Sequence, residues 1–168
     1  MEEFLVGRVE GDHGGDDLSE GAPISSKAER VKVRTLEAVH ARLAAPSALP
    51  RVLAGDLNTP QYESREGEVR SFARTRTGKL RPQFDERHDA AELALITGLA
   101  EHGYVDAFRV LHGYERRDRS WAYPTIPKAG WRLDHIFARG LRVEACDYVH
   151  AWREDGLSDH SAMWARVC

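Results

Sequence analysis

Three short polar stretches of the chain carry the side chains that could do chemistry. Asp56 and Asn58 are spaced i, i+2 in the stretch GDLN, directly after the apolar run RVLAG. Asp134 lies in WRLDHIF, where a lone carboxylate inside an apolar strand pattern is costly unless it is paired. Asp159 and His160 lie in LSDHS, in a predicted turn before the last strand. Together these stretches offer carboxylates, an imidazole and an amide, and no serine or cysteine stands out as a nucleophile.

This set of groups suits hydrolysis with water as the nucleophile. Carboxylates hold a hard cation such as Mg²⁺, which prefers oxygen ligands and usually keeps several waters. Such a cation polarises a phosphoryl oxygen and stabilises a leaving alkoxide. An imidazole oriented by a carboxylate can hold a phosphate oxygen as a cation, or it can transfer a proton. An Asn amide can donate a hydrogen bond to charge that develops in the transition state.

Each stretch also has a purely structural interpretation. An Asp-x-Asn sequence after a strand is most often turn chemistry. Asp134 could be a buried carboxylate that pairs with Arg132 or with a backbone amide, and Asp159 could simply start a turn. The occurrence of all three stretches in this order, each beside a predicted strand, favours a functional interpretation.

The elements that must position these groups are predicted from apolar spacing and turn residues. Ser26 and Glu29 form a capping-box signature, which opens a helix that runs to about residue 44. A second helix is expected over 89–101 and is closed by Gly103. Strands are expected in FLVGRVE, RVLAG, YVDAFRV, WRLDHIFA, LRVEACDYVHA and SAMWARV. This order predicts an α/β layered domain with a mixed sheet.

Two polar loops lie between these elements. Residues 59–87 are predicted to form a long loop, and its part over 65–81 contains six basic residues: Arg65, Arg70, Arg74, Arg76, Lys79 and Arg81. Arg74 and Arg76 are candidates for phosphate contacts. In the second loop Trp121 ends the stretch YERRDRSW, and Tyr123 follows it; both could stack on a base or a sugar. Solvated charged loops would have the same composition.

Composition restricts the class of protein. The chain has 168 residues, 42% hydrophobic and 30% charged, which is ordinary for one globular domain. The net charge of −3 means that a polyanionic partner has to be met by a local basic patch. The apolar runs are too short to span a bilayer, and no signal-peptide order is present. Cys146 and Cys168 form no disulfide framework, so the expected compartment is a reducing cytoplasm.

The motifs GDLN, RLDHIF and SDH, in this order before a final strand, resemble those of the endonuclease/exonuclease/phosphatase superfamily. The resemblance covers residues 27–167. It implies a four-layered α/β sandwich and Mg²⁺-dependent hydrolysis of phosphodiesters or phosphomonoesters, with Mn²⁺ as a second cation to consider. GYVDAFR, SWAYP and GWRLD are most similar to the exonuclease III and abasic-site endonuclease branch. That branch implies nucleic acid as the partner, DNA ahead of RNA, and a role in DNA repair.

The resemblance also implies a role for each polar residue. Asp56 would orient or deprotonate the attacking water, and Asn58 would donate a hydrogen bond to the scissile phosphate. His160 would contact the same phosphate and would be held in its charged form by Asp134. Asp159 would be a metal ligand or would lie beside the metal.

Trp131 and Leu133 match positions that line the abasic-sugar pocket in that branch, although both could equally be core residues. The chain departs from the family before the first predicted helix. There the family has a strand ending in Asn, a strand with the Glu that is the main metal ligand, and a strand with a His or Tyr near the phosphate. The polar residues of this chain that could be offered as substitutes are Glu2, Glu3, Glu10, Asp12 and His13.

We therefore expect residues 1–26 to be an irregular segment and 27–168 to be the C-terminal part of a family domain. The sandwich should then be incomplete on its N-terminal side, which would expose apolar surface and predict self-association or pairing with another polypeptide. Three functional hypotheses follow. The chain is a nuclease whose activity is impaired by the missing part, a non-catalytic nucleic-acid-binding remnant, or a phosphatase on small phosphoesters.

Overall fold

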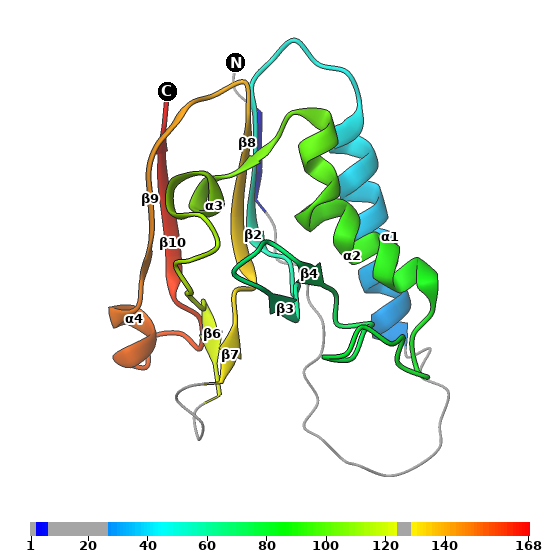
Figure 1. Cartoon of the computed structure of the whole chain (residues 1–168). Coiled ribbons are helices and arrows are strands. Elements are labelled where there is room, and N and C mark those ends of the chain that lie inside the picture. The colour runs from blue at the N-terminus through cyan, green and yellow to red at the C-terminus, as the bar shows by residue number, and fades with distance from the viewer. Residues whose placement is uncertain (1–2, 7–26, 124–128) are drawn as a thin grey trace.

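A four-stranded mixed sheet forms the centre of the described part of the chain, which comprises residues 3–6, 27–123 and 129–168 of a computed structural model (Figure 1). In spatial order its strands are β1 (Glu3–Val6), β2 (Arg51–Asp56), β8 (Asp134–Arg139) and β5 (Val105–Asp106). β1 runs parallel to β2, whereas β8 is antiparallel to both β2 and β5. The register sets Asp56 directly opposite Asp134. Two of the three polar stretches therefore meet at one end of the sheet.

Two helices cover one face of this sheet, α1 (Lys27–Ala44) and α2 (Glu86–Ile96) (Figure 1). Their apolar side chains recur at helical spacing, so one stripe of each helix faces inward. The main core lies between these helices and the sheet, and includes Leu36, Leu43, Leu53, Leu95 and Phe137. This burial fixes β2 and β8 against the helices and so determines where their polar ends lie.

A second sheet of two antiparallel strands, β9 (Val143–Val149) and β10 (Ala162–Val167), lies on the other side of β8 from the helices (Figure 1). A smaller core joins it to helix α3 (Ala107–His112) through Phe108, Cys146 and Tyr148. The phenol of Tyr148 donates a 2.6 Å hydrogen bond to the carbonyl of Asp134. The prediction of a layered α/β fold with a mixed sheet is confirmed.

Two short hairpins lie near the end of the central sheet at which β2 finishes (Figure 1). One pairs β3 (Tyr62–Glu63) with β4 (Val69–Arg70), and the other pairs β6 (Trp121–Ala122) with β7 (Gly130–Trp131). A one-turn helix, α4 (Ala151–Glu154), connects β9 to the approach to β10. The stretch 59–87, predicted as one long loop, thus contains the β3–β4 hairpin and the start of α2.

The second helix differs from its prediction at both ends. It begins at Glu86 because Asp85 is its N-cap, and the Asp85 carboxylate accepts a 2.8 Å hydrogen bond from the backbone N–H of His88. It ends at Ile96 and continues as a 3₁₀ turn, η1 (Gly98–His102). Gly103, with φ at 79°, closes this turn as the spacing predicted.

The prediction of a strand over YVDAFRV was wrong. Only Val105–Asp106 is extended, and the chain then forms α3. The cause is Asp106, whose carboxylate accepts hydrogen bonds from the backbone N–H groups of Phe108 and Arg109 and caps the new helix.

The remaining strand predictions are confirmed with narrower bounds. WRLDHIFA is divided between β7 and β8, and LRVEACDYVHA ends as β9 before α4. Of the FLVGRVE stretch, only β1 falls among the described residues, as does only Glu29 of the predicted capping box. Glu2, Glu10, Asp12 and His13 lie outside the described residues.

Candidate active site at the shared end of β2 and β8

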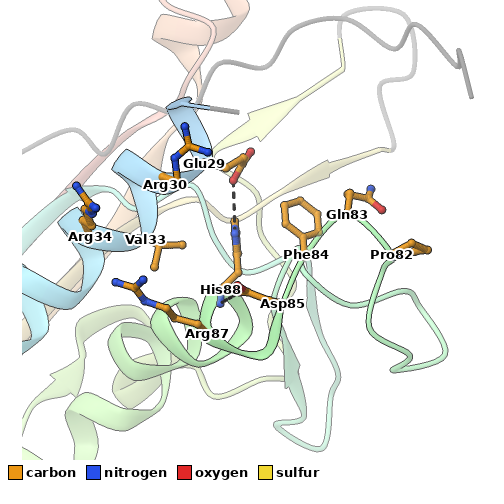
Figure 2. Close-up of a pocket in the computed structure, with 10 residues that line it drawn as sticks. All are labelled: Glu29, Arg30, Val33, Arg34, Pro82, Gln83, Phe84, Asp85, Arg87 and His88. Atoms are coloured by element: carbon orange, nitrogen blue, oxygen red, sulfur yellow. Dashed lines mark hydrogen bonds and ion pairs between the residues drawn. The ribbon is translucent and has the colours of Figure 1, made fainter. Parts of the chain in front are cut away.

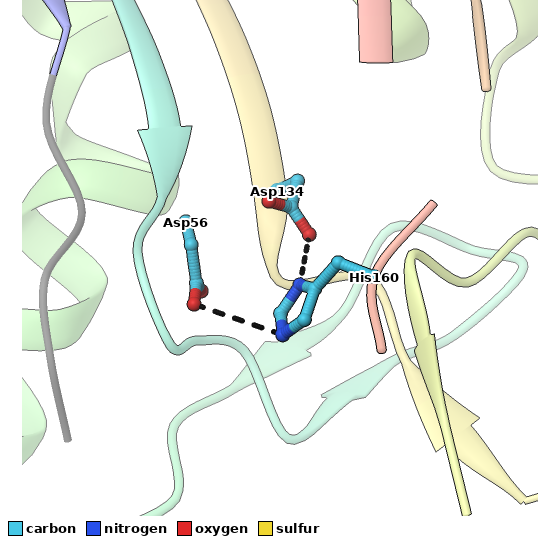
Figure 3. Close-up of side chains that lie close together, drawn as sticks. All are labelled: Asp56, Asp134 and His160. Atoms are coloured by element: carbon cyan, nitrogen blue, oxygen red, sulfur yellow. Dashed lines mark hydrogen bonds and ion pairs between the residues drawn. The ribbon is translucent and has the colours of Figure 1, made fainter. Parts of the chain in front are cut away.

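His160 lies between two carboxylates at the shared end of β2 and β8 (Figure 3). Its Nδ1 is 2.7 Å from Oδ2 of Asp134, which is hydrogen-bond distance, and its Nε2 is 3.9 Å from Oδ2 of Asp56. All three side chains are at least partly buried. The structure therefore brings together one residue from each of the three polar stretches found in the sequence.

The surroundings of His160 favour its charged form. Burial alone would lower the pKa of this imidazole, because the charged form loses hydration. The hydrogen bond to Asp134 and the negative charges of Asp134, Asp56 and Asp159 outweigh that cost, so the pKa of His160 is raised above its usual value. A cationic imidazole at this point can donate a hydrogen bond to an anionic oxygen.

The GDLN turn is held by its own side chains. Oδ1 of Asp56 accepts a 2.8 Å hydrogen bond from the backbone N–H of Asn58, and Nδ2 of Asn58 lies 3.4 Å from Oδ2 of Asp56. Asn58 has φ at 51°, a left-handed conformation that Asn tolerates better than most residues. The backbone N–H of Leu57 donates to the carbonyl of Leu133, which joins the turn to the chain just before β8. The turn chemistry and the functional interpretation of GDLN are therefore compatible.

A buried ion pair supports this turn from the helical side. Nζ of Lys32 donates to Oε1 of Glu92 at 2.6 Å and to the carbonyl of Asn58 at 2.9 Å. Oε2 of Glu92 accepts from the hydroxyl of Thr59 and from the backbone N–H of Phe72. Glu92 is fully buried, and its neighbours keep its pKa lowered despite that burial. This pair was not predicted from the sequence. The available signal was that Lys32, beside Val33, and Glu92, within AAELALI, each interrupt the apolar stripe of a predicted helix.

Ser120 joins the two strands of chain that carry Asp134 and His160. This residue is fully buried, and its Oγ accepts hydrogen bonds from the backbone N–H groups of Leu133 at 2.9 Å and Asp134 at 3.0 Å. Its carbonyl accepts a 2.7 Å hydrogen bond from the N–H of Ser161. Next to it, Trp121 forms an isolated β-bridge with His160. The hydroxyl and the carbonyl of one buried residue thus link the segment of the imidazole to that of its carboxylate partner.

An aromatic wall stands beside this pair. Trp121 and Trp131 face each other across the β6–β7 hairpin, with ring centroids 5.3 Å apart and ring planes at 14°. Tyr123 and Phe72 meet these rings edge-on. Both tryptophans are half-buried. The wall is joined to His160 by the backbone bridge of Trp121, and the roles of Trp121 and Trp131 in substrate binding stay predictions.

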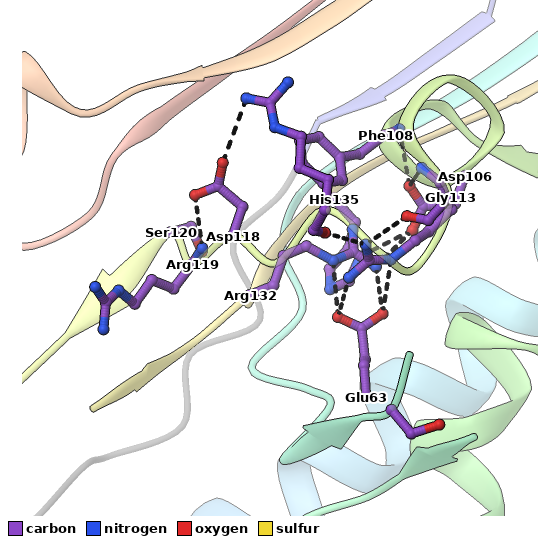
Figure 4. A network of polar contacts seen from close by, with 12 residues as sticks. Glu63, Asp106, Phe108, Gly113, Asp118, Arg119, Ser120, Arg132 and His135 are labelled. Carbon is purple, nitrogen blue, oxygen red and sulfur yellow. Dashed lines mark hydrogen bonds and ion pairs between the residues drawn. The ribbon is translucent and has the colours of Figure 1, made fainter. Parts of the chain in front are cut away.

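A buried network of charges fixes the chain that leads into β8 (Figure 4). Glu63 of β3 receives bidentate hydrogen bonds from both Arg109 and Arg132, and Arg132 also contacts Asp106 at 2.7 Å. Burial would raise the pKa of Glu63, but the two guanidinium groups lower it to about 2. Arg132 therefore pairs with these two carboxylates, and Asp134 is left for His160.

Two cavities lie near the three-residue cluster. One, of about 480 Å³, is lined by Asp134 and His160 together with apolar groups of Ile136, Trp152 and Met163. The other, of about 320 Å³, lies between the N-terminal ends of α1 and α2 and is lined by Glu29 and His88, which contact each other (Figure 2). Nε2 of His88 is also 3.0 Å from Oε1 of Glu92. Asp134 and His160 thus line the first cavity, and the second is linked to the Lys32–Glu92 ion pair through His88.

The family model described as the endonuclease/exonuclease/phosphatase family matches residues 23–160. The chain belongs to this family. Among solved structures, an AP endonuclease from Archaeoglobus fulgidus is similar, with a TM-score of 0.58 and 23% identity over 86% of this chain and 56% of that chain. D. rerio TDP2 humanized by 14 mutations is also similar, with a TM-score of 0.54 and 17% identity over 86% of this chain and 51% of that chain.

The chain thus spans about half the length of the solved structures that it matches. Because the identities are low, these likenesses show a shared fold. None of the curated proteins matches the sequence. No helix among the described residues combines the length and the apolar character that crossing a membrane requires.

Other residues singled out in the sequence are not members of the cluster. Asp159 is exposed beside His160 and is outside the group of three ligand atoms. Arg74 is tied to Asp89 and Glu86 by ion pairs, so its guanidinium serves the start of α2. Arg76 is exposed. Separately, Leu133 is fully buried, which favours its interpretation as a core residue.

The donor set of this family member fits a hard divalent cation at its carboxylates. Ligand atoms of Asp56, Asp134 and His160 lie within 4.8 Å of one another. Mg²⁺ is usually held by one or two carboxylates, with water and substrate phosphate completing its coordination. Within the described ranges this is the one group of its kind, and it includes no glutamate. Glu63 and Glu92 are each engaged in buried ion pairs, so neither replaces the family's metal-binding Glu.

Proposed function

We propose that the chain is a metal-dependent phosphodiester hydrolase that acts on nucleic acid, with DNA as the favoured substrate and Mg²⁺ or Mn²⁺ as the cation. The observation that carries this proposal is the position of His160, which lies between Asp134 and Asp56 at the shared end of two core strands. Membership of the endonuclease/exonuclease/phosphatase family supports a phosphoester substrate.

In the proposed reaction, Asp56 accepts a proton from the attacking water or orients it. The Asn58 amide and the cationic His160 donate hydrogen bonds to oxygens of the scissile phosphate, and Asp134 keeps the imidazole charged and oriented. Asp56, with Asp134 or Asp159 beside it, would hold the cation. When bound, the cation would polarise the phosphoryl oxygen and stabilise the leaving oxygen.

Nucleic acid is favoured over small phosphoesters for two reasons. The aromatic wall of Trp121 and Trp131 beside His160 supports stacking against a base or a sugar. Both similar structures named above have a TM-score above 0.5, and one of them is an AP endonuclease. These points also support a role in DNA repair. A cytoplasmic location is supported by Cys146 and Cys168, which are free thiols.

The test is cleavage of a plasmid and of an abasic-site duplex with Mg²⁺, by the wild type and by Asp56→Asn and His160→Ala. His102→Ala, on η1 beyond the C-terminal end of α2, is the matched control. We expect cleavage by the wild type and the control, and a loss of about a hundredfold or more in both site variants. Cleavage that survives both site substitutions would overturn the assignment.

Two other outcomes would point to the alternative functions. Salt-sensitive DNA binding without cleavage would identify a nucleic-acid-binding remnant. Turnover of a generic phosphomonoester without DNA affinity would identify a phosphatase. Self-association through an incomplete sheet stays a prediction. Sedimentation of a Trp164→Glu variant would test it, since Trp164 on β10 is 45% exposed.

A further inference from the structure

A cavity of about 460 Å³ lined by three arginines lies beside α4, apart from the cavity that holds Asp134 and His160. The arginines are Arg117 and Arg119, which precede β6, and Arg153 of α4. Over the described ranges, neither Arg117 nor Arg119 has a hydrogen-bonded or ion-paired guanidinium, and Nη1 of Arg153 is buried without a hydrogen-bond partner. Arg117 is exposed and Arg119 is partly buried, whereas a buried guanidinium nitrogen such as Nη1 of Arg153 is rarely left without a partner.

The acidic groups of this cavity do not neutralise it. Asp118 is already engaged, because its Oδ1 lies 3.1 Å from Nε2 of His150 and its Oδ2 lies 3.5 Å from Nη2 of Arg116. Glu154 is exposed. The three arginines therefore carry a local excess of positive charge, which the sequence net charge of −3 conceals.

The position of Arg119 is fixed by close packing of the β6–β7 hairpin. A Cβ on Gly130 would come within 2.2 Å of the carbonyl of Trp121 and 3.1 Å of Cδ of Arg119. Only a glycine at this position lets β7 pack so closely against β6, and this close packing places the aliphatic part of Arg119 against β7. In Figure 4 the side chain of Arg119 points away from the buried Glu63–Arg132 network. Its guanidinium is thus directed to the cavity side of the hairpin.

The arginine cavity and the cavity of His160 have no lining residue in common, but residues of their walls are neighbours. Trp152 of α4 lines the cavity of His160, and its neighbour Arg153 lines the arginine cavity. His150 lines the arginine cavity and makes a 2.8 Å hydrogen bond with the hydroxyl of Ser161, which lines the other. A polyanion that occupies the cavity of His160 can therefore extend past α4 to the arginine cavity.

We propose that this arginine cavity binds a backbone phosphate next to the scissile one, on the same nucleic-acid strand. Guanidinium groups match phosphate oxygens bidentately, and a strand presents phosphates at regular spacing along its length. The inference rests on the proposed function, because it assigns the second phosphate of the same substrate. It makes Arg119 and Arg153 substrate-binding residues in place of Arg74.

The test measures binding without turnover. Fluorescence anisotropy of a fluorescein-labelled single strand, in EDTA and over a series of salt concentrations, is compared for wild type, Arg119→Gln and Arg153→Gln. Arg142→Gln is the control, since Arg142 is exposed and precedes β9 at the opposite end of the second sheet. Thermal unfolding of each variant shows that it is folded.

We expect each cavity variant to weaken binding about tenfold, and to lower the slope of log K against log salt by about 0.7, the value for one phosphate contact on a single strand. Unaltered affinity and slope in folded variants would overturn the proposal.

A second arm separates a strand phosphate from a free anion. Inorganic phosphate is expected to compete only at concentrations far above the dissociation constant of the strand. Competition at equal concentration would make this a free-anion site and would also overturn the proposal. Because binding is read in EDTA, its failure is distinct from a failure of hydrolysis in Asp56→Asn.

Discussion

Asp134 holds Nδ1 of His160 at 2.7 Å, and this contact directs Nε2 of the same ring toward Asp56. A ring held in this way presents one nitrogen to the substrate in a fixed direction. The raised pKa of His160 means that the ring stays cationic to higher pH than a free imidazole. The carboxylate–imidazole pair is therefore a means of placing a fixed positive charge near Asp56.

The first prediction concerns pH. In Asp134→Asn the hydrogen-bonded anion is lost, so the pKa of His160 should fall and the alkaline limb of kcat/KM should move to lower pH. The rate at neutral pH should fall by about a hundredfold or more. An NMR titration of the His160 ring protons, with Glu101→Gln on η1 as the control, checks the pKa directly. A profile that overlies the wild type would refute the prediction.

The raised pKa of His160 also makes the stability of the fold depend on pH. The dependence is opposite to that of a carboxylate with a lowered pKa, because the stabilisation is lost at high pH and not at low pH. Since the folded pKa of His160 is raised, its stabilising contribution is complete below the unfolded pKa of about 6.5. It is lost as pH rises through the folded pKa. Urea unfolding at a series of pH values should show this loss in the wild type and a smaller one in Asp134→Asn.

The buried ion pair behind GDLN gives a second prediction. Lys32→Met should destabilise the fold by about 3–5 kcal/mol, because it leaves the Glu92 charge buried without its partner. The double variant Lys32→Met, Glu92→Gln should lose less than the single variant, since the uncompensated charge is gone. Urea unfolding measures both free energies. A double variant that loses as much as the sum of two single changes would contradict the coupling.

The sequence predicted the architecture and the three polar stretches because both follow from local rules. Apolar spacing predicted α1, β2 and β8. Because Asp56 and Asp134 lie where these two strands end and begin, pairing of the strands brings both side chains to one end of the sheet. The sequence could not show the supporting groups, because Lys32, Glu92 and Ser120 are joined by contacts between distant segments. The strand prediction for YVDAFRV was wrong because the Asp106 carboxylate caps a helix there, which outweighs the strand propensity of the following residues. The spacing of apolar residues alone does not reveal such a cap.

A third prediction follows from the network of Glu63. Burial and its two arginines give this residue a pKa of about 2, so its contribution is present above the unfolded pKa of about 4.5. It is lost as pH falls toward 2. Glu63→Gln should therefore remove most of the acid dependence of stability in that window. Glu63→Ala should destabilise the fold by about 3–5 kcal/mol, since it leaves Arg109 and Arg132 without their shared partner.

Urea unfolding between these pH values measures the effect in Glu63→Gln. Glu68→Gln, at an exposed carboxylate that pairs only with Arg70, serves as the control and should change little. An acid dependence of Glu63→Gln that equals the wild type would show that other carboxylates dominate acid unfolding.

A fourth prediction concerns the cation. Mg²⁺ that binds only the folded protein should raise the unfolding midpoint by mass action, with a rise that grows with concentration. Asp56→Asn should reduce or abolish that rise, because it removes one carboxylate of the cluster. It should leave the fold intact, since the Asn side chain has nearly the same shape and its oxygen can still accept the hydrogen bond from the backbone N–H of Asn58. Differential scanning calorimetry with and without EDTA measures the shift. An equal rise in wild type and variant would exclude Asp56 as a ligand.

The last prediction concerns Ser120, as a positioning residue. Ser120→Ala removes the acceptor of two buried N–H groups, at Leu133 and Asp134, and should cost about 1–3 kcal/mol of stability. Activity well below the unfolding midpoint should fall further than the folded fraction does, because the backbone of Asp134 loses its link to the segment of His160. The alkaline limb of the pH profile should also move, since the Asp134–His160 hydrogen bond loosens. Ser47→Ala, at an exposed hydroxyl that bonds only locally, is the control and should leave both properties unchanged. A variant that loses stability but keeps the wild-type rate and pH profile would reduce Ser120 to a structural role.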